Sequence, residues 1–306
     1  MKILVTGASG FVGTNISEHL ADKYEIIGTD MNRQKEHTCN MVVGDLLDRR
    51  MLETLFKRWD FDVILHFAAQ ARVDPSFADP IGTYRANVET TINLLEIAKT
   101  KNIRFIVASS EIIYGKADEY PCKEHFHLRP DSPYAASKAA LDLMVQQVPN
   151  TVVIRSGMGY GPRSPPSQVI TKFILTCMRG GDLTFPTSTS DPVVHPTRDV
   201  NYIGNFVRGI EQLLEHPEIS GVFNMGSGQE VDLLSLARKV IATVGNGEIV
   251  YSSNFHYRHG EEGKRTWLDN SKAQEAFGYE PQIKLDEGLQ MTYDWLKKGG
   301  RKKYGW

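Results

Sequence analysis

The chain opens with MKILVTGASGFVG, residues 1–13, and this stretch decides the fold. An apolar run typical of a buried strand is followed by Gly7, Gly10 and Gly13 and then by an amphipathic segment. Glycines so placed permit a tight turn, a close approach of backbone amides to a phosphate, and close packing of a helix on a sheet. Glycines that serve only a turn are the alternative. The strand–loop–helix context favours a site for the pyrophosphate of a dinucleotide.

Short apolar runs alternate with amphipathic segments through the first half of the chain. We expect strands at residues 3–6, 25–29, 41–43, 63–67, 105–108 and 152–154, and helices at 12–21, 50–58, 84–99 and 134–147. Several of the strand runs are apolar throughout, as in strands buried on both faces. The alternation therefore predicts the α/β class, with a doubly wound parallel sheet of the Rossmann type over residues 1–163.

The rhythm breaks at residues 161–166, which read GPRSPP. Stretches rich in Pro, Gly, Ser and Thr then separate helices such as the one expected at 233–243. We expect residues 164–306 to form mainly a second, smaller α/β domain, with residues 196–228 folding back onto the first.

Composition narrows the classes of function. The 306 residues are 41% hydrophobic and 24% charged, with a formal net charge of −2, so no large positive field is available for nucleic acid. Cys39, Cys122 and Cys177 lie far apart, which predicts neither a disulfide framework nor a metal site and favours a reducing cytoplasm. We expect no signal peptide, and no apolar stretch reaches the roughly 18 residues of a membrane span.

Two aspartates follow the second and third expected strands. A carboxylate at Asp30 would accept hydrogen bonds from both hydroxyls of the adenosine ribose and repel a 2′-phosphate, so we expect NAD rather than NADP. Arg33 weakens this expectation, because an arginine nearby tolerates the extra phosphate. Asp45 is placed either to meet the adenine edge or to serve as an N-cap or turn aspartate.

A second motif, SPYAASK at residues 132–138, predicts a helix start with Ser132 as the N-cap and Pro133 at the first helical position. Tyr134 and Lys138 then lie one turn apart on one face. Because an ammonium favours a nearby phenolate, we expect Lys138 to lower the pKa of Tyr134 and make it a general base. Lys138 is also placed to hold the nicotinamide ribose. An ordinary amphipathic surface helix is the alternative, which the preceding glycine loop disfavours.

The fifth expected strand ends near Ser110 and Glu111. In a doubly wound sheet the carboxyl ends of the strands point at the ligand crevice. We expect Ser110 to hydrogen-bond the reacting oxygen of the substrate. For Glu111, a role in the site and the capping of a loop amide are both open.

Taken together, these motifs resemble the extended short-chain dehydrogenase/reductase family of NAD-dependent nucleotide-sugar epimerases and dehydratases. The resemblance covers essentially the whole chain. It is carried by TGASGFVG (6–13), GD (44–45), HFAAQ (66–70), NVETT (87–91), SSEIIYG (109–115), SPYAASK (132–138), YGPR (160–163), RD (198–199), NMGSG (224–228), RHGEEG (258–263) and LDNSKA (268–273).

The resemblance implies roles for individual residues. Ser110, Tyr134 and Lys138 would form the catalytic triad, with Glu111 beside them. The cofactor contacts would be Gly7, Gly10, Phe11, Val12, Gly13, Asp30, Asp45, Leu46, Ala68, Ala69, Asn87, Tyr134 and Lys138. The substrate contacts would be Gln70, Phe185, Arg198 and Arg258, of which the two arginines match residues that grip the nucleotide diphosphate. Residues 164–306 would supply the nucleotide-sugar site, and the helices at 84–99 and 134–147 would form a homodimer.

Three departures from the family pattern bear on the reaction. Met158 stands where an asparagine commonly bonds the substrate phosphate, and Thr90 replaces a glycine. Family dehydratases carry Asp-Glu, and decarboxylases Ser-Glu, three and two residues before the tyrosine of the YG motif. Here Glu111 and Ile112 occupy these positions.

Dehydration needs both an acid and a base, and here one carboxylate is left for the two tasks. We therefore expect a 4-epimerase of a UDP-hexose or UDP-hexuronate that acts through a transient 4-keto sugar. The alternatives are a 4,6-dehydratase, a decarboxylase or a 4-oxidising enzyme that uses Glu111. A binding protein that senses NAD without chemistry is the alternative outside the enzymes.

Overall fold

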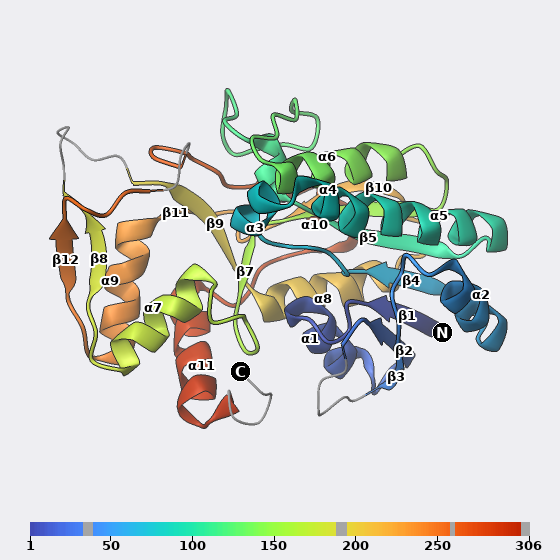
Figure 1. Ribbon diagram of the computed structural model, residues 1–306, viewed down its shortest axis with the longest axis horizontal. Helices are drawn as coiled ribbons and strands as arrows, with labels where there is room; N and C mark the ends of the chain where they lie inside the picture. The colour runs from blue at the N-terminus through green and yellow to red at the C-terminus, as the bar shows by residue number, and fades with distance from the viewer. Residues whose placement is uncertain (33–38, 188–194, 258–260, 301–306) are drawn as a thin grey trace.

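The computed structural model describes residues 1–32, 39–187, 195–257 and 261–300 (Figure 1). Its main feature is a parallel seven-stranded sheet in the order β10-β6-β5-β4-β1-β2-β3. The strands are β1 (Lys2–Thr6), β2 (Glu25–Asp30), β3 (Asn40–Val43), β4 (Val63–His66), β5 (Arg104–Ser110), β6 (Thr151–Ser156) and β10 (Gly221–Met225). The direction of winding reverses between β1 and β4, so the predicted doubly wound α/β fold is confirmed.

Helices cover both faces of this sheet because successive side chains of a strand point to opposite sides. Leu4 belongs to the core under α2 (Arg49–Arg58), α5 (Thr90–Lys101) and α6 (Pro133–Val145). Ile3 and Val5 belong to the core that includes α1 (Phe11–Leu20) and α8 (Ile203–Leu214). All three side chains are fully buried, which is why the strand is apolar throughout.

The segment expected to be one helix at 84–99 contains a π-helical turn. This turn, η1 (Arg85–Glu89), lies between α4 (Pro80–Tyr84) and α5. The short helix α3 (Val73–Ala78) precedes α4. The buried residue Asn87 of η1 joins two other segments. The side-chain amide donates to the carbonyl of Gln70 (3.0 Å) and to Oγ of Ser137 (2.8 Å), and Oδ1 accepts from the N–H of Gln70 (2.7 Å).

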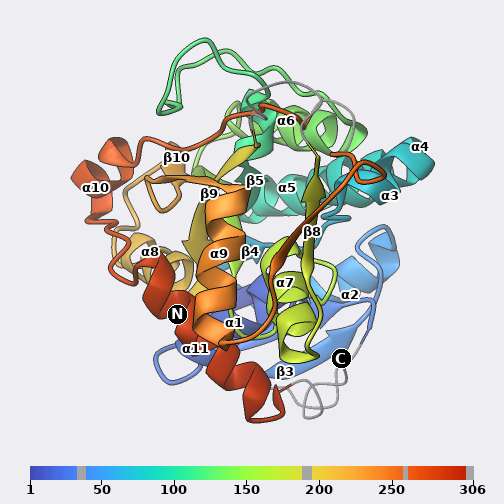
Figure 2. The same ribbon diagram turned by 90° about the vertical axis from the view of Figure 1, so that its left-hand side faces the viewer.

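Two smaller sheets lie beside the large one. One has the order β11-β9-β7, from β7 (Met158–Tyr160), β9 (Thr197–Tyr202) and β11 (Glu230–Asp232), and the other pairs β8 (Leu183–Pro186) with β12 (Ile249–Ser252). The helices α7 (Val169–Met178), α9 (Leu233–Val244) and α11 (Leu285–Lys297) cluster here, at the left of Figure 1 and toward the viewer in Figure 2. The remaining helix, α10 (Ser271–Phe277), packs near β10.

The chain returns to the large sheet after its excursion into the smaller ones, because β10 pairs in parallel with β6. The division into domains at residue 163 stays a prediction. Within the described ranges, no helix has the length and apolar character needed to cross a membrane.

Candidate active site

A crevice of about 1640 Å³ lies along the carboxyl ends of β1 to β6 and is closed on its other side by residues of β7, β9 and β11. Sites for one drug-sized ligand measure about 300–1,000 Å³. The crevice is therefore large enough for two ligands side by side.

The glycine loop forms one end of this crevice. Gly7 has a φ of +68°, which favours glycine, and a Cβ built on Gly13 would stand 2.2 Å from the carbonyl oxygen of Gly7. Gly10, Phe11, Val12 and Gly13 line the crevice at the start of α1. The exposed amides and positive dipole end of this helix fit the pyrophosphate of NAD.

Asp30 and Asp45 lie beside this loop. The carboxylate of Asp30 accepts hydrogen bonds from the N–H of Ser9 and the N–H of Asn32, both at 3.1 Å, and it lines the crevice with lone pairs to spare for ribose hydroxyls. Asp45 makes a local turn by accepting from the N–H of Leu47 (2.9 Å), and it also lines the crevice. The predicted cofactor contacts Leu46, Ala68 and Ala69 line it as well. Arg33 and Arg258 lie outside the described residues.

The start of α6 is built as its sequence predicted. Oγ of Ser132 accepts from the N–H of Ala135 (3.1 Å), and Pro133 occupies the first helical position. The N–H of Tyr134 donates to Oγ of Ser76 on α3 (3.1 Å), and its side chain hydrogen-bonds Ser110. Tyr134 and Ser110 thus meet at the crevice.

Lys138 lies one turn further along α6 and is buried behind the crevice lining. Its Nζ donates to the carbonyl of Ala108 (2.7 Å) on β5. Burial lowers the pKa of Lys138 to about 8, against the charge of Asp142, which raises it. Asn87 is likewise buried and supports the crevice through Gln70 and Ser137.

The expected lowering of the Tyr134 pKa by Lys138 is wrong for the protein chain alone. Burial raises the pKa of Tyr134 to about 12, the hydrogen bond to Ser110 opposes this, and the charge of Glu111 adds to it. The desolvation of a phenolate therefore outweighs the effect of an ammonium that is directed at Ala108. When bound, oxidised NAD supplies the hydride acceptor and a positive ring that would favour the phenolate.

Glu111 begins the turn η2 (Glu111–Tyr114) and is 5% exposed. Its carboxylate accepts from the N–H of Asp199, which lies in the strand β9 and not in a loop, so the expected capping of a loop amide is not found. Oε2 has no partner among the described residues. Burial, and then the charge of Asp199, raise the pKa of Glu111 well above its usual range, against the charge of Arg198. The side chain also lines the crevice.

The substrate side of the crevice holds charged pairs. Arg198 on β9 donates to the carbonyl of Thr197 (2.7 Å) and forms an ion pair with Glu261. The guanidinium expected to bind the substrate diphosphate is therefore paired with a carboxylate of the protein itself. Lys264, 5% exposed, pairs with Asp131 at 2.6 Å, just before α6. Sequence reasoning missed Glu261 and Lys264, although the charged run at 261–265 was a signal.

The other predicted substrate residues are placed differently. Gln70 lines the crevice, as does Met158, which leaves an apolar surface where the family pattern has an asparagine. Phe185 is 1% exposed and packs edge-to-face on His195, with ring centroids 5.6 Å apart. Phe185 is absent from the crevice lining in the described ranges, because the alternation of β8 turns it into the core. The expected contact of Phe185 with the nucleotide base is therefore not supported.

Comparison with known proteins yields relatives along the whole chain. Residues 4–292 match the family model described as GDP-mannose 4,6 dehydratase. The chain is 29% identical over 316 residues to UDP-glucuronic acid decarboxylase 1 of Xenopus tropicalis, covering 97% of this chain and 72% of that protein.

Two solved structures share the fold. One is the UDP-glucose 4-epimerase of Thermotoga maritima with UDP-glucose, which has a TM-score of 0.87, 27% identity and coverage of 98% and 99% of the two chains. The other is the dTDP-glucose 4,6-dehydratase of Bacillus anthracis in complex with NAD, which has a TM-score of 0.84, 25% identity and coverage of 100% and 99%.

Proposed function

The chain belongs to the GDP-mannose 4,6-dehydratase family, the extended short-chain dehydrogenases/reductases that act on nucleotide sugars with NAD, and from that premise we propose that it is a nucleotide-sugar 4-epimerase. The proposed substrate is a UDP-hexose or a UDP-hexuronate. The observation that carries the proposal is the crevice wall beside Tyr134. Ile112 lines it where a second carboxylate would be needed for dehydration.

In this proposal Tyr134 accepts the proton of the sugar 4-hydroxyl, and Ser110 holds that oxygen through its hydroxyl. The C4 hydride would pass at the same stage to NAD held by the glycine loop and, once the 4-keto sugar has turned over, would return to its other face. Tyr134 then gives the proton back. Lys138 contributes its charge and a hydrogen bond to the nicotinamide ribose.

We expect the diphosphate of the substrate to bind Arg198. The ion pair between Arg198 and Glu261 then has to open, because both anions compete for one guanidinium fork. Before the substrate binds, the ion pair with Glu261 holds the Arg198 guanidinium at the crevice wall.

A second candidate is a 4,6-dehydratase, decarboxylase or 4-oxidising enzyme that uses Glu111. The buried carboxyl, its raised pKa and its unpartnered Oε2 favour it, because these are properties of an acid/base placed for proton transfer. An NAD-binding sensor without chemistry is disfavoured, because Ser110, Tyr134 and Lys138 are all retained.

The test is incubation with UDP-, dTDP-, GDP- and CDP-sugars in D2O, followed by mass spectrometry and NMR of the products. A 4-epimerase gives a product of unchanged mass with inverted C4 and no deuterium on carbon. Loss of water or carbon dioxide, or deuterium at C5 or C6, contradicts it. Glu111→Gln separates the same candidates, since it should cost less than about tenfold in rate for a 4-epimerase and more than about a hundredfold where Glu111 transfers a proton.

We also propose a homodimer formed through α3 to α6. Large apolar side chains are exposed along these neighbouring helices, which a second copy would cover. They are Phe77, Ile81, Tyr84, Ile92 and Leu143.

A further inference from the structure

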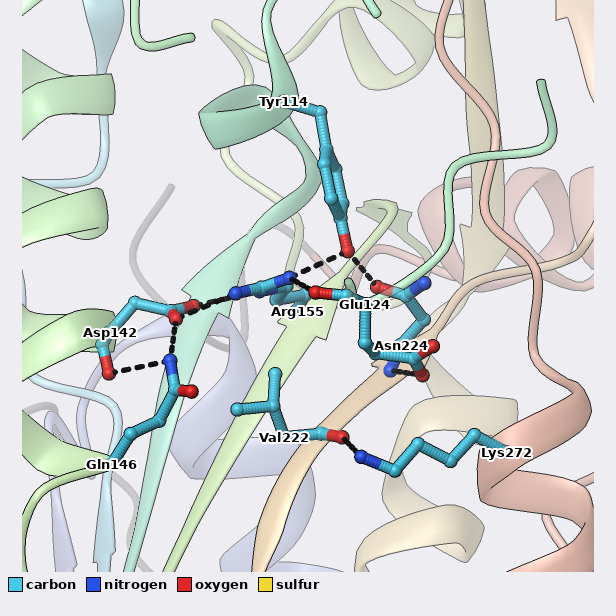
Figure 3. A network of polar contacts seen from close by, with 8 residues as sticks. All are labelled: Tyr114, Glu124, Asp142, Gln146, Arg155, Val222, Asn224 and Lys272. Carbon is cyan, nitrogen blue, oxygen red and sulfur yellow. Dashed lines mark hydrogen bonds and ion pairs between the residues drawn. The ribbon is translucent and has the colours of Figure 1, made fainter. Parts of the chain in front are cut away.

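A buried ion pair lies between α6 and the sheet. The side chains of Asp142 on α6 and Arg155 on β6 are 0% and 3% exposed. The guanidinium meets the carboxylate as a fork, with Nε to Oδ2 and Nη2 to Oδ1 both at 2.9 Å (Figure 3). This bidentate arrangement fixes direction as well as distance.

Arg155 also links three further segments by hydrogen bonds, two of them directly and the third through Tyr114 (Figure 3). Its Nη1 donates to the hydroxyl of Tyr114, at the end of η2, at 2.9 Å and to the carbonyl of Glu124 at 2.8 Å. The Tyr114 hydroxyl donates in turn to Oδ1 of Asn224 on β10 at 2.8 Å. Arg155 therefore ties α6, η2 and β10 to one strand.

Stability alone does not account for such a pair, because apolar replacement of a buried ion pair is often neutral or stabilising. Its place on the helix is more informative. Tyr134, Lys138 and Asp142 follow one another at intervals of four residues, so they lie along one face of α6. The turn η2, which Tyr114 holds from its other end, begins at Glu111 beside the crevice.

We propose that Asp142 and Arg155 are positioning residues, whose ion pair holds α6 against β6 so that Tyr134 faces the crevice and Lys138 stays within reach of the Asp142 carboxylate. Asp142 also provides the negative charge nearest along the helix to Lys138. The proposal rests on the proposed function only in that Tyr134 and Lys138 take part in the chemistry.

The electrostatic setting of Lys138 agrees with this role. Burial lowers the pKa of Lys138 to about 8. The negative charge of Asp142 opposes this effect, because it raises the pKa of Lys138. His66 on β4 is neutral beside it, because burial and the charge of Lys138 lower its pKa to about 3. The ionisable groups nearest this face are Tyr134 on α6, Glu111 and Tyr114 on η2, Arg155 on β6 and Glu124 on the loop before α6. The other elements packed on α6 carry Asp74 on α3, Tyr84 on α4, Arg85 and Glu89 on η1 and Arg104 on β5.

The test is Asp142→Asn in the NAD-loaded enzyme. Asparagine keeps a hydrogen bond to Arg155 and loses the charge, so Lys138 should lose its proton at lower pH. We expect the alkaline limb of the kcat profile to move down by about one pH unit or more, with KM for the nucleotide sugar within about twofold. NMR titration of isotope-labelled lysine side chains, with the Lys138 signal assigned from Lys138→Met, should show the same shift without any turnover.

Two further variants distinguish a specific change in the Lys138 titration from a general loss of stability. Asp142→Asn combined with Arg155→Gln leaves no buried charge unpaired and should show a downward shift as well. The matched control is Arg104→Lys on β5, a buried arginine that donates to the carbonyls of Leu213, His216 and Ile219. This control should lower the melting temperature and leave the Lys138 titration in place.

The outcomes separate the two proposals. An unchanged Lys138 titration in a folded Asp142→Asn protein or in the double variant overturns the positioning role. A shifted titration in a protein that converts no nucleotide sugar overturns the proposed function and leaves the positioning role intact.

Discussion

Replacing Glu111 by glutamine should stabilise the folded protein at alkaline pH and leave its stability in acid nearly unchanged. Glutamine has the size of glutamate and keeps an oxygen that accepts from the N–H of Asp199. The substitution removes the ionisable carboxyl, whose charged form is destabilised by burial.

The magnitude follows from the raised pKa of Glu111. A carboxyl whose pKa is higher in the folded than in the unfolded chain leaves stability intact below its unfolded value of about 4.3, and stability falls as the pH rises toward the folded value. The loss is at most about 1.4 kcal/mol for each pH unit between the two values. Glu111→Gln abolishes this loss, at roughly 2 °C of melting temperature per kcal/mol in a chain of this size.

The assay is thermal unfolding of both proteins, with and without NAD, at intervals from about pH 5 to about pH 9. The variant should melt near the parent at the acidic end and progressively above it as the pH rises. The exposed Glu280→Gln serves as control and should follow the parent throughout. If the Glu111→Gln and parent melting temperatures stay parallel, Glu111 titrates like an exposed carboxyl and the argument from burial is refuted.

Four other outcomes are expected. Asp30→Asn should narrow a preference for NAD over NADP, measured by calorimetry on protein freed of cofactor; tighter binding of NADP by the parent would contradict the role given to Asp30. Tyr134→Phe should lower turnover by about a hundredfold or more while the nucleotide sugar still binds, and a rate within a few-fold of the parent would remove Tyr134 from the mechanism. Gly13→Ala should weaken NAD binding far more than Gly10→Ala, because the new Cβ would stand 2.2 Å rather than 3.1 Å from the Gly7 carbonyl; equal effects in fluorescence titration would argue against the loop as the site. Leu143→Glu should yield monomers in sedimentation if α3 to α6 form the dimer, whereas a parent that is already monomeric would exclude it.

The sequence predicted those parts of the fold and site that depend on local pattern. Each of the six strands expected in the large sheet carries its own apolar run, and the cofactor loop is defined by the spacing of three glycines. The π-helical turn around Asn87 left no such trace, because its five residues, RANVE, include neither a glycine nor a proline that would mark a break in the helix.

Contacts between distant segments could not be predicted in the same way. The partners in Arg198–Glu261, Lys264–Asp131 and Asp142–Arg155 lie in different elements, and only the folded chain brings them together. The effect on the Tyr134 pKa had the wrong sign because desolvation depends on burial, which a motif does not report.

The late return of the chain to the large sheet has a consequence for biosynthesis. On the ribosome β6 is made well before β10, with residues 157–220 between them. Until β10 emerges, the backbone amides and carbonyls along one side of β6 stand open to any other extended chain. Pauses in translation before β10 has left the ribosome should therefore prolong a state that aggregates or recruits chaperones, whereas pauses after β10 has emerged should not.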